Sequence, residues 1–327
     1  MSHRCGGASA VPVAPLLSVI ATSHTLDRLD DVFDLMDSLE AQRYAPLETL
    51  FVAEGSRELY ERVAAYIAER KIANSRVLFN GGEPGLSAAR NVGIKAAKGE
   101  ILAFLDDDAI AFPDWADEVV RASQADTVIG LTGATLPLWD DGALSWLPEE
   151  FYWLISCTGW TGWQDVREVR NAWGHNMAFR REAFHACGGF NNSHGFHRGA
   201  FAEDNEFSLR ARAATGKRIV FSPHARVWHK VHRYRLSWAW VAERSYFIGR
   251  SRRMLQRAAG AAAPLGVERG LLRRILTRLL PRTLANLPRQ PRLAGRRLAL
   301  IAASLTFLAL GYLSGLLDRS VQKGEAG

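Results

Sequence analysis

The chain has 327 residues, of which 48% are hydrophobic and 23% are charged, a composition typical of globular proteins that excludes a disordered or collagen-like chain. The length fits one large α/β domain with an appendage, or two modest domains. The net charge of +7 lies after residue 260, where eleven basic residues accompany three acidic ones, so the rest of the chain is close to neutral. This distribution argues against nucleic acid as a partner.

The first fifteen residues contain no apolar run of signal-peptide length, and we expect them to form a flexible N-terminus. The three cysteines, Cys5, Cys157 and Cys187, are odd in number and widely spaced. That spacing indicates reduced, structural cysteines rather than a disulfide scaffold or a zinc site. Both observations favour a cytosolic main domain.

Residues 16–105 alternate between short apolar runs and apolar residues at helical spacing. The predicted strands are 16–21, 49–53, 77–79 and 101–105, and the predicted helices are 30–42, 57–71 and 87–98. This order indicates a mainly parallel sheet with helices on both faces. Ligands of such sheets bind at the carboxyl ends of the strands, where we expect the functional site.

Polar residues follow three of the four predicted strands. They are Ser23 and His24 after the first strand, Glu54 after the second, and Asp106, Asp107 and Asp108 after the fourth. Three adjacent carboxylates repel one another unless a cation compensates them. Oxygen ligands suit Mg²⁺ or Mn²⁺, which are usually bound together with substrate phosphates. The alternative is a solvated turn before the helix that Pro113 begins.

Tryptophan is concentrated between residues 138 and 174, which hold six of the ten in the chain. This density suits either core packing or the membrane-facing rim of a sugar-binding cleft. Farther along, Glu203 and Asp204 begin a predicted helix, where carboxylates either cap the helix or serve as a general base. Strands are predicted at 217–222 and 225–228.

The basic charge belongs to the C-terminal part. Residues 267–297 hold nine arginines among leucines at helical spacing, and residues 298–317 contain no charge. Twenty helical residues reach about 30 Å, the thickness of a hydrocarbon core, and the arginines suit anionic headgroups. We expect a basic amphipathic segment at 259–297, a transmembrane or membrane-embedded helix at 298–317 and a tail at 318–327. The alternative is a buried helix of a soluble fold.

Five motifs occur in an order that resembles family 2 glycosyltransferases. They are Ser18-Val-Ile with Ser23, Glu54-Gly-Ser, Gly85-Leu-Ser-Ala-Ala-Arg-Asn91, Phe104-Leu-Asp-Asp-Asp108 and Ala202-Glu-Asp204. The resemblance covers residues 16–250 and implies the α/β GT-A fold over 16–258, with sugar transfer from a nucleotide donor and help from a metal. Pro148–Trp153 and Ser245–Ser251 resemble, more specifically, archaeal-type enzymes that add hexuronic acid to dolichyl-phosphate-linked glucose.

The resemblance implies donor contacts at the strand ends. Ser23 and Glu54 stand where family members contact the nucleobase, and His24 stands where a tyrosine is usual. Arg90 stands near the donor ribose or diphosphate, although an ordinary solvated arginine fits the same helix.

The resemblance also implies a metal site. Asp106 and Asp108 match the outer positions of the Asp-x-Asp motif, with Asp107 between them on the donor side. Asp108 is then the direct metal ligand, and Asp106 lies nearer the ribose. His229 stands where many GT-A enzymes place a histidine that contacts metal or diphosphate. Its alternative is a surface histidine in a cationic patch.

On the acceptor side, residues 171–180 resemble the family strand that runs beneath the acceptor, which implies acceptor contacts for Trp173 and Asn176. Asp204 is the implied general base, and Glu203 is the next candidate.

The sequence therefore predicts a metal-dependent, inverting glycosyltransferase on the cell membrane, with its catalytic domain in the cytoplasm. We expect a nucleotide-diphosphate sugar donor, most simply a UDP-sugar, and a polyprenyl-linked or other membrane-associated saccharide acceptor. Two alternatives remain: a polyprenyl-phosphate monosaccharide synthase, and an inert membrane scaffold that binds sugar nucleotides.

Overall fold

The computed structural model describes residues 14–142, 146–192, 203–259 and 266–317. Within these residues the chain forms a nine-stranded sheet of order β3-β2-β1-β4-β8-β6-β9-β5, with β7 paired to β9. The strands are β1 (Leu17–Ser23), β2 (Leu47–Glu54), β3 (Ser75–Asn80), β4 (Ile101–Asp106), β5 (Ala109–Ala111), β6 (Val128–Trp139), β7 (Arg167–Val169), β8 (Asn176–Arg180) and β9 (Arg218–Val231).

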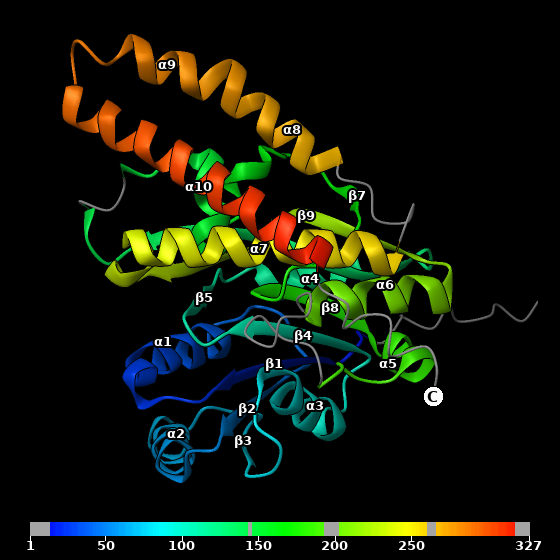
Figure 1. Ribbon diagram of the computed structural model, residues 1–327. Coiled ribbons are helices and arrows are strands. Elements are labelled where there is room, and N and C mark those ends of the chain that lie inside the picture. The colour runs from blue at the N-terminus through cyan, green and yellow to red at the C-terminus, as the bar shows by residue number, and fades with distance from the viewer. Residues whose placement is uncertain (1–13, 143–145, 193–202, 260–265, 318–327) are drawn as a thin grey trace, which may run out of the picture.

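Ten α-helices lie within the described residues, on both faces of the sheet and above it (Figure 1). They are α1 (Leu29–Glu40), α2 (Arg57–Arg70), α3 (Leu86–Ala96), α4 (Trp115–Ala122), α5 (Arg181–Cys187), α6 (Glu203–Thr215), α7 (Trp238–Ala259), α8 (Gly266–Arg274), α9 (Leu280–Ala285) and α10 (Pro291–Leu317). Shorter turns include the 3₁₀ helices η1 (Leu26–Arg28), η3 (Glu149–Ile155) and η6 (Arg233–Leu236), and the π-helix η8 (Ile275–Leu279).

The strands β3-β2-β1-β4 are parallel to one another. Each contains a run of at least three consecutive apolar residues because helices cover both faces of this part of the sheet. The register places Thr22 beside Asp106 and Glu54 beside Asn80, so the carboxyl ends of the strands meet at one edge. The predicted α/β fold is confirmed, together with its alternating strands and helices.

The second half of the sheet is mixed, since β8 is antiparallel to both β4 and β6, whereas β6 and β9 are parallel. Two strands were expected at 217–222 and 225–228, but they form one strand, β9. The register jumps between the pairs Gly133–Ser222 and Thr135–Val227, so several residues bulge out of β9 there. This bulge contains Pro223, whose missing N–H interrupts strand pairing.

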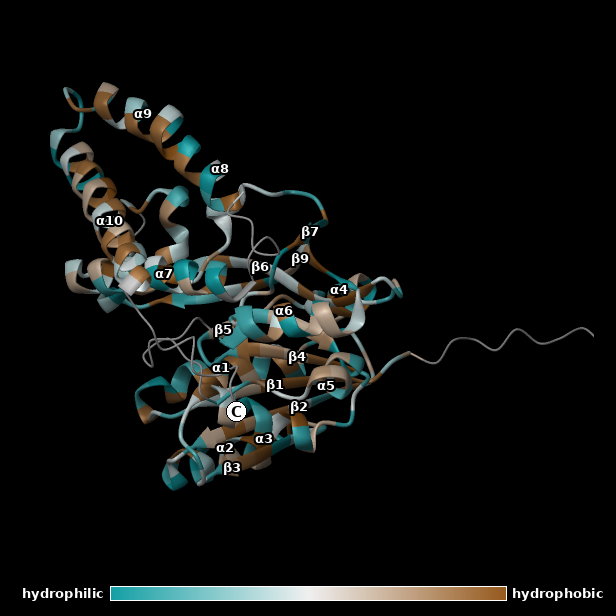
Figure 2. Cartoon of the chain, turned by 45° about the vertical axis from the view of Figure 1, so that its right-hand side comes forward, coloured by the Kyte–Doolittle hydropathy of each residue, from teal (hydrophilic) through white to brown (hydrophobic). Residues whose placement is uncertain are grey.

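Two apolar clusters fill the two faces of the sheet. One is formed with α1, α2 and α4 and includes Leu35, Phe51 and Trp115. The other is formed with α3, α5 and α6 and includes Phe104, Phe179 and Phe207. Figure 2 shows the central strands in the brown of apolar residues. The architecture is a sheet between two helical layers.

A third apolar cluster joins the C-terminal helices to the main domain. It packs Phe151 and Leu154 of η3 against Ile275 and Leu279 of η8 and against Leu300 of α10, all of which are buried. The C-terminal helices are therefore part of the packed structure and share its core.

The expected boundary at residue 298 does not coincide with the start of a helix. The helix α10 begins at Pro291 and includes the arginines at 292, 296 and 297. Proline is favoured in the first turn of a helix because its missing N–H has no partner there. The helix α7 continues through residue 259, and most of the predicted N-terminal segment 1–15 and the whole tail 318–327 lie outside the described residues.

Close backbone contact holds α10 against α7. A Cβ atom added at Gly311 would lie 1.9 Å from the carbonyl oxygen of Tyr246, and one at Gly249 would lie 2.1 Å from that of Leu308. Only glycine allows two helices to approach so closely. Figure 1 shows α10 crossing over α7.

The outer surface of α10 remains apolar. The segment Pro291–Leu316 is long and apolar enough to cross a membrane, with a mean hydropathy of 1.8 in its best window, of which 28% is buried. Leu310, Leu313 and Leu316 are exposed, as are leucines of α8 and of the segment around α9. Because its inner face packs along α7 and the third cluster, α10 lies along the domain surface.

We predict that Gly311→Ala destabilises the protein, because the added methyl group overlaps the backbone of α7. Overpacking of this kind costs about 1–3 kcal/mol. The matched control is Gly295→Ala in the same helix, where nothing lies within 4 Å of the added Cβ and helix propensity favours alanine. Thermal unfolding of both variants measures the difference. Equal melting temperatures would contradict the close packing.

Candidate active site

A cavity of about 490 Å³ opens at the carboxyl edge of the parallel strands. Four of the residues selected from the sequence line it, namely Arg90 from α3, Asp106 from β4, and Glu203 and Asp204 from α6. Gly85 to Ala88, which precede and begin α3, line another part of its wall. The cavity brings together residues that lie more than a hundred positions apart in the chain.

Asp108 is the most enclosed charge near this cavity, with no exposed surface. Its Oδ2 accepts hydrogen bonds from Nη1 of Arg28 at 2.5 Å and from Nη2 of Arg235 at 2.6 Å. Its Oδ1 lies 3.1 Å from Nε2 of His229. Two guanidinium groups from η1 and η6 thus converge on one buried carboxylate.

These contacts set the charge of the aspartates. Burial alone would raise the pKa of Asp106, but His229 and Arg90 lower it below its usual value. Burial opposes ionisation of Asp108 as well, and its pKa is nevertheless lowered by His229 and Arg235. Both carboxylates are therefore anionic at neutral pH.

Asp106, Asp108 and His229 form a group that fits a divalent cation. One ligand atom of each lies within 4.8 Å of the others. The Oδ1 atom of Asp108 is buried and makes no hydrogen bond within the described structure, so it is available to a ligand. Two carboxylates and an imidazole suit Mn²⁺ better than Mg²⁺, which prefers oxygen ligands.

Asp204 is held rigidly at the start of α6. Its Oδ2 accepts a hydrogen bond from the N–H of Gly174 at 2.8 Å, and its Oδ1 accepts one from the N–H of Asn205 at 2.6 Å. Burial and the charge of Glu203 raise its pKa to about 6. A carboxylate with this pKa is largely ionised at pH 7 and can accept a proton.

Glu203 is occupied differently from its neighbour. Its carboxylate accepts a hydrogen bond from Arg90 at 2.7 Å, and Arg90 also lies 3.8 Å from Asp106. Because an arginine neutralises Glu203, Asp204 is the better proton acceptor of the two.

The residues selected for nucleobase contact lie at the same sheet edge but do not line the cavity directly. Ser23 is buried at the end of β1, and His24 is exposed. The carboxylate of Glu54 accepts a hydrogen bond from the N–H of Gly85, which does line the cavity. Asp107 is not part of the metal-ligand group, and its carboxylate pairs with Arg28 at 2.9 Å.

Asn176 does not face an acceptor as expected. It is buried in β8, where its amide donates to the carbonyls of Ala134 and Ala225 and accepts from the indole of Trp115. These bonds engage both the NH₂ group and the oxygen of the amide, so Asn176 links β8 to β6 and β9.

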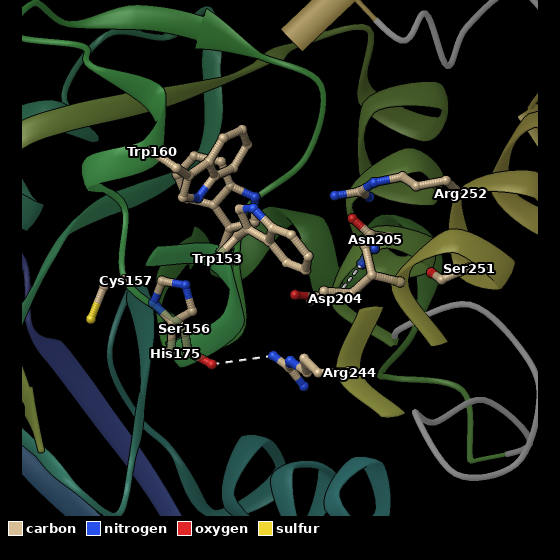
Figure 3. A pocket seen from close by; sticks show the side chains of 12 residues that line it. Trp153, Ser156, Cys157, Trp160, His175, Asp204, Asn205, Arg244, Ser251 and Arg252 are labelled. Carbon is tan, nitrogen blue, oxygen red and sulfur yellow. Dashed lines mark hydrogen bonds between the residues drawn. The ribbon is translucent and has the colours of Figure 1, made fainter. Parts of the chain in front are cut away.

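Trp173 lines a second, smaller pocket of about 130 Å³. Trp153 and Trp160 line the same pocket, and Figure 3 shows them opposite Asp204, Arg244 and Arg252. All six tryptophans of the dense region are partly buried. Trp153 and Trp160 belong to separate short helices, because η3 ends at Ile155 and another 3₁₀ turn spans Gly159–Thr161.

Three arginines of the site were missed as site residues. Arg28, Arg235 and Arg244 all line the larger cavity. The signal in the sequence was proximity along the chain: Arg28 lies five residues beyond β1, and Arg235 lies six residues beyond His229 in the cationic patch. Burial alone would lower the pKa of Arg28, but Asp107 and Asp108 raise it, and the group remains positive.

Comparison with known proteins places this geometry in context. Residues 25–188 match the family described as Glycosyl transferase family 2. Over 305 residues the chain is 29% identical to a protein of Haloferax volcanii named glucosyl-dolichyl phosphate glucuronosyltransferase, covering 92% of this chain and 96% of that protein.

Two solved structures share the fold at lower identity. A mannosyltransferase of Pyrobaculum calidifontis in complex with GDP-Man and Mn²⁺ has a TM-score of 0.62 and 17% identity, covering 94% of this chain and 89% of its own. TarS of S. aureus in complex with UDP-GlcNAc has a TM-score of 0.50 and 16% identity, covering 74% of this chain and 70% of its own.

We predict that the protein binds Mn²⁺ and that Asp108→Asn weakens this binding about tenfold or more, because an amide cannot replace an anionic ligand. Electron paramagnetic resonance of free Mn²⁺ measures the affinity. Asp107→Asn is the control, since Asp107 lies outside the ligand group. His229→Gln is a second test that leaves the carboxylate cluster intact. Binding unchanged in both ligand variants, or absent from the unaltered protein, would refute the site.

Proposed function

Because the chain belongs to glycosyl transferase family 2, an enzyme family that uses nucleotide sugars, we propose a specific reaction for it. The protein is a metal-dependent, inverting transferase that moves a sugar from a UDP-sugar to a polyprenyl-linked saccharide at the cytoplasmic face of the cell membrane. The observation that carries this proposal is the cavity in which Asp106, Arg90 and Asp204 meet.

The donor lies along the edge of the parallel strands. Ser23 and Glu54 contact the nucleobase at the ends of β1 and β2. Arg28 and Arg235, which line the cavity beside Asp106, bind the diphosphate, because guanidinium groups pair well with phosphate oxygens. His24 is exposed at this edge.

Asp106, Asp108 and His229 hold the divalent cation. Their donor atoms favour Mn²⁺, the ion bound in the Pyrobaculum mannosyltransferase structure. When bound, the cation stabilises the negative charge that develops on the leaving nucleotide. Arg28 and Arg235 add fixed positive charge to the part of the cavity that holds the diphosphate. Both also donate to Oδ2 of Asp108 and so orient its carboxylate.

Asp204 acts as the general base. It takes the proton of an acceptor hydroxyl as the hydroxyl oxygen attacks the anomeric carbon. The bond from that carbon to the diphosphate oxygen breaks on the opposite side, and its electron pair leaves with the nucleoside diphosphate. A single displacement of this kind inverts the configuration at the anomeric carbon. Glu203 precedes Asp204 and pairs with Arg90, which also lies beside Asp106. This pair therefore holds the base in a fixed position relative to the donor side of the cavity.

The acceptor is a lipid-linked saccharide. Support comes from the relative named glucosyl-dolichyl phosphate glucuronosyltransferase, which matches the chain over 92% of its length. The apolar surface of α10 and the arginines of α8 to α10 fit a bilayer with anionic headgroups. Positive charge is favoured on the cytoplasmic side of membranes, so the catalytic domain faces the cytoplasm.

A polyprenyl-phosphate monosaccharide synthase is the competing function. It would transfer the sugar to the lipid phosphate itself, so mild acid would release the label as a monosaccharide, whereas a product extended from a phosphate-linked saccharide would release the label in an oligosaccharide. Chromatography of the radiolabelled lipid product before and after acid treatment separates the two. An inert scaffold is disfavoured by membership of an enzyme family and by an ionisable Asp204 beside the donor cavity.

We predict that Asp204→Asn lowers the transfer rate about 10²–10⁴-fold with donor affinity unchanged, because the amide cannot accept the proton. Rates are measured as nucleotide release and lipid-product formation, with and without EDTA. Glu206→Gln in the same helical turn is the control, since Glu206 pairs with Arg210 outside the cavity. A near wild-type rate in Asp204→Asn would show that Asp204 only caps the helix.

The pH dependence gives a second readout of the same prediction. Transfer should fall as the pH drops through about 6, because protonation removes the base. Because the folded-state pKa is raised from its ordinary value of 3.8, the stability that the protonated carboxyl contributes is lost as the pH rises from about 4 to about 6, and Asp204→Asn should not melt earlier at pH 8. A rate independent of pH between 5 and 8 would contradict the assignment.

We also predict that replacing Arg273, Arg278 and Arg282 together with glutamine weakens binding to vesicles containing anionic phospholipid. Each arginine near such a surface contributes about 1 kcal/mol, so the loss should reach about tenfold to hundredfold at low salt. Co-sedimentation with phosphatidylglycerol vesicles measures binding, and glutamine at Arg57, Arg62 and Arg121 is the control. Equal loss in both triple variants would argue against a C-terminal membrane surface.

A further inference from the structure

The smaller pocket adjoins the donor cavity at the general base. Both are lined by Ser156, His175, Asp204 and Arg244. The metal-ligand residue Asp106 lines only the larger cavity, whereas the three tryptophans and Arg252 line only the smaller one. Asp204 therefore stands between two compartments of different composition.

One face of α7 forms a wall of this smaller pocket. Arg244, Ile248, Ser251 and Arg252 are spaced as residues that share a helical face. Figure 3 shows Arg244 and Arg252 on the side facing Asp204, with Trp153 and Trp160 across the space. Indole rings opposite polar groups are a common platform for sugars and their substituents.

Two arginines, Arg244 and Arg252, and one carboxylate, Asp204, are the charged residues that line this pocket within the described structure. Arg252 pairs with Glu268 at 3.0 Å, but Glu268 is shared with Arg170, also at 3.0 Å. With Arg244 and Asp204, the group holds three arginines and two carboxylates. Burial and the nearby Arg235 lower the pKa of Arg244 to about 10, so it stays charged. Burial lowers the pKa of His175 to about 3, so it is neutral.

The net positive charge of these residues grows during the reaction. When Asp204 takes up the proton of the acceptor, one of the two carboxylates loses its charge. An anion in the pocket would offset both the initial and the added positive charge, and buried arginines bind anions strongly because water does not screen them.

The opposite face of α7 leads toward the apolar helix α10. Tyr246 and Gly249 contact α10, and Arg253 lies against Gly315. A helix with its side chains is about 10–12 Å across, so α7 and α10 together place the exposed leucines of α10 about 20 Å beyond the pocket. A molecule with a phosphate near its sugar and a lipid chain beyond it fits this arrangement.

We propose that the smaller pocket is the acceptor subsite and that it binds the phosphate of a phosphate-linked saccharide, with Arg252 and Arg244 as its anion ligands. The volume of about 130 Å³ is that of about four water molecules, enough for a phosphate beside one edge of a sugar ring. This inference rests on the proposed function, since it assumes that Asp204 separates donor from acceptor.

The test uses the full-length protein in detergent with UDP and Mn²⁺ present, and three probes titrated by calorimetry. Glucosyl decyl phosphate carries charge and chain, decyl glucoside carries only the chain, and glucose 1-phosphate carries only the charge. The proposal requires the first probe to bind about tenfold or more tightly than decyl glucoside, since charge-assisted hydrogen bonds contribute that much. If glucose 1-phosphate binds as tightly as the first probe, the natural ligand of the pocket is a soluble sugar phosphate. If it binds more weakly, the natural ligand is a lipid-linked sugar phosphate.

The variant Arg252→Gln should abolish the preference for charged probes, while Arg252→Lys should retain part of it. Arg253→Gln is the matched control, because Arg253 lies on the α10 side of the same helix. Equal affinity for charged and neutral probes, no binding of any probe, or an unchanged preference in Arg252→Gln would overturn the proposal. If Arg252→Gln fails to fold, the comparison of probes on the unaltered protein decides alone.

Turnover in the same preparation separates this inference from the proposed function. Donor hydrolysis and transfer to membrane lipids test the glycosyltransferase activity without reference to the pocket. An active enzyme with no preference for phosphate refutes only the acceptor subsite. A protein that binds the charged probes but consumes no nucleotide sugar refutes the proposed function.

Discussion

The buried carboxylate of Asp108 is the point on which the candidate site depends. It follows β4, yet its partners come from η1 after β1, from β9 and from η6, so it joins distant parts of the chain. A buried carboxylate is destabilising unless it is paired, and breaking such a pair costs several kcal/mol, about 3–5 in measured cases. The pairing therefore fixes where Arg28, Arg235 and His229 stand around the cavity. It also leaves one carboxylate oxygen of Asp108 directed at His229.

Much of the parallel half of the fold could be predicted from the sequence. Strands β1 and β4 contain the apolar runs Val19–Ala21 and Ile101–Leu105 because both of their faces are covered, and polar residues follow these runs. Arg28 could not be assigned in the same way, because its role depends on Asp107 and Asp108, about eighty residues away. Asn176 shows the opposite problem: its motif suggested an acceptor contact, but its amide is used entirely within the sheet. Sequence spacing gives the position of a residue along an element, whereas its partners depend on tertiary packing.

The helix α7 connects the pocket beside Asp204 to the apolar helix α10. Its inner face lines the pocket beside Asp204, and its outer face receives α10 through contacts that only glycine permits. Both faces belong to one rigid element, so a displacement of α10 would be transmitted to the position of Arg244 and Arg252. The C-terminal helices therefore pack against the part of the chain that carries the candidate site.

Glu268 has a practical consequence for work on the purified protein. It lies in α8, and its carboxylate stands between Arg170 and Arg252. A chain shortened before α8 to improve solubility would lose that carboxylate, leave two guanidinium groups facing each other and uncover the apolar surface of η3. An inactive truncated chain would then report damage to the pocket wall beside Asp204, and it would say nothing about whether the enzyme needs a lipid surface.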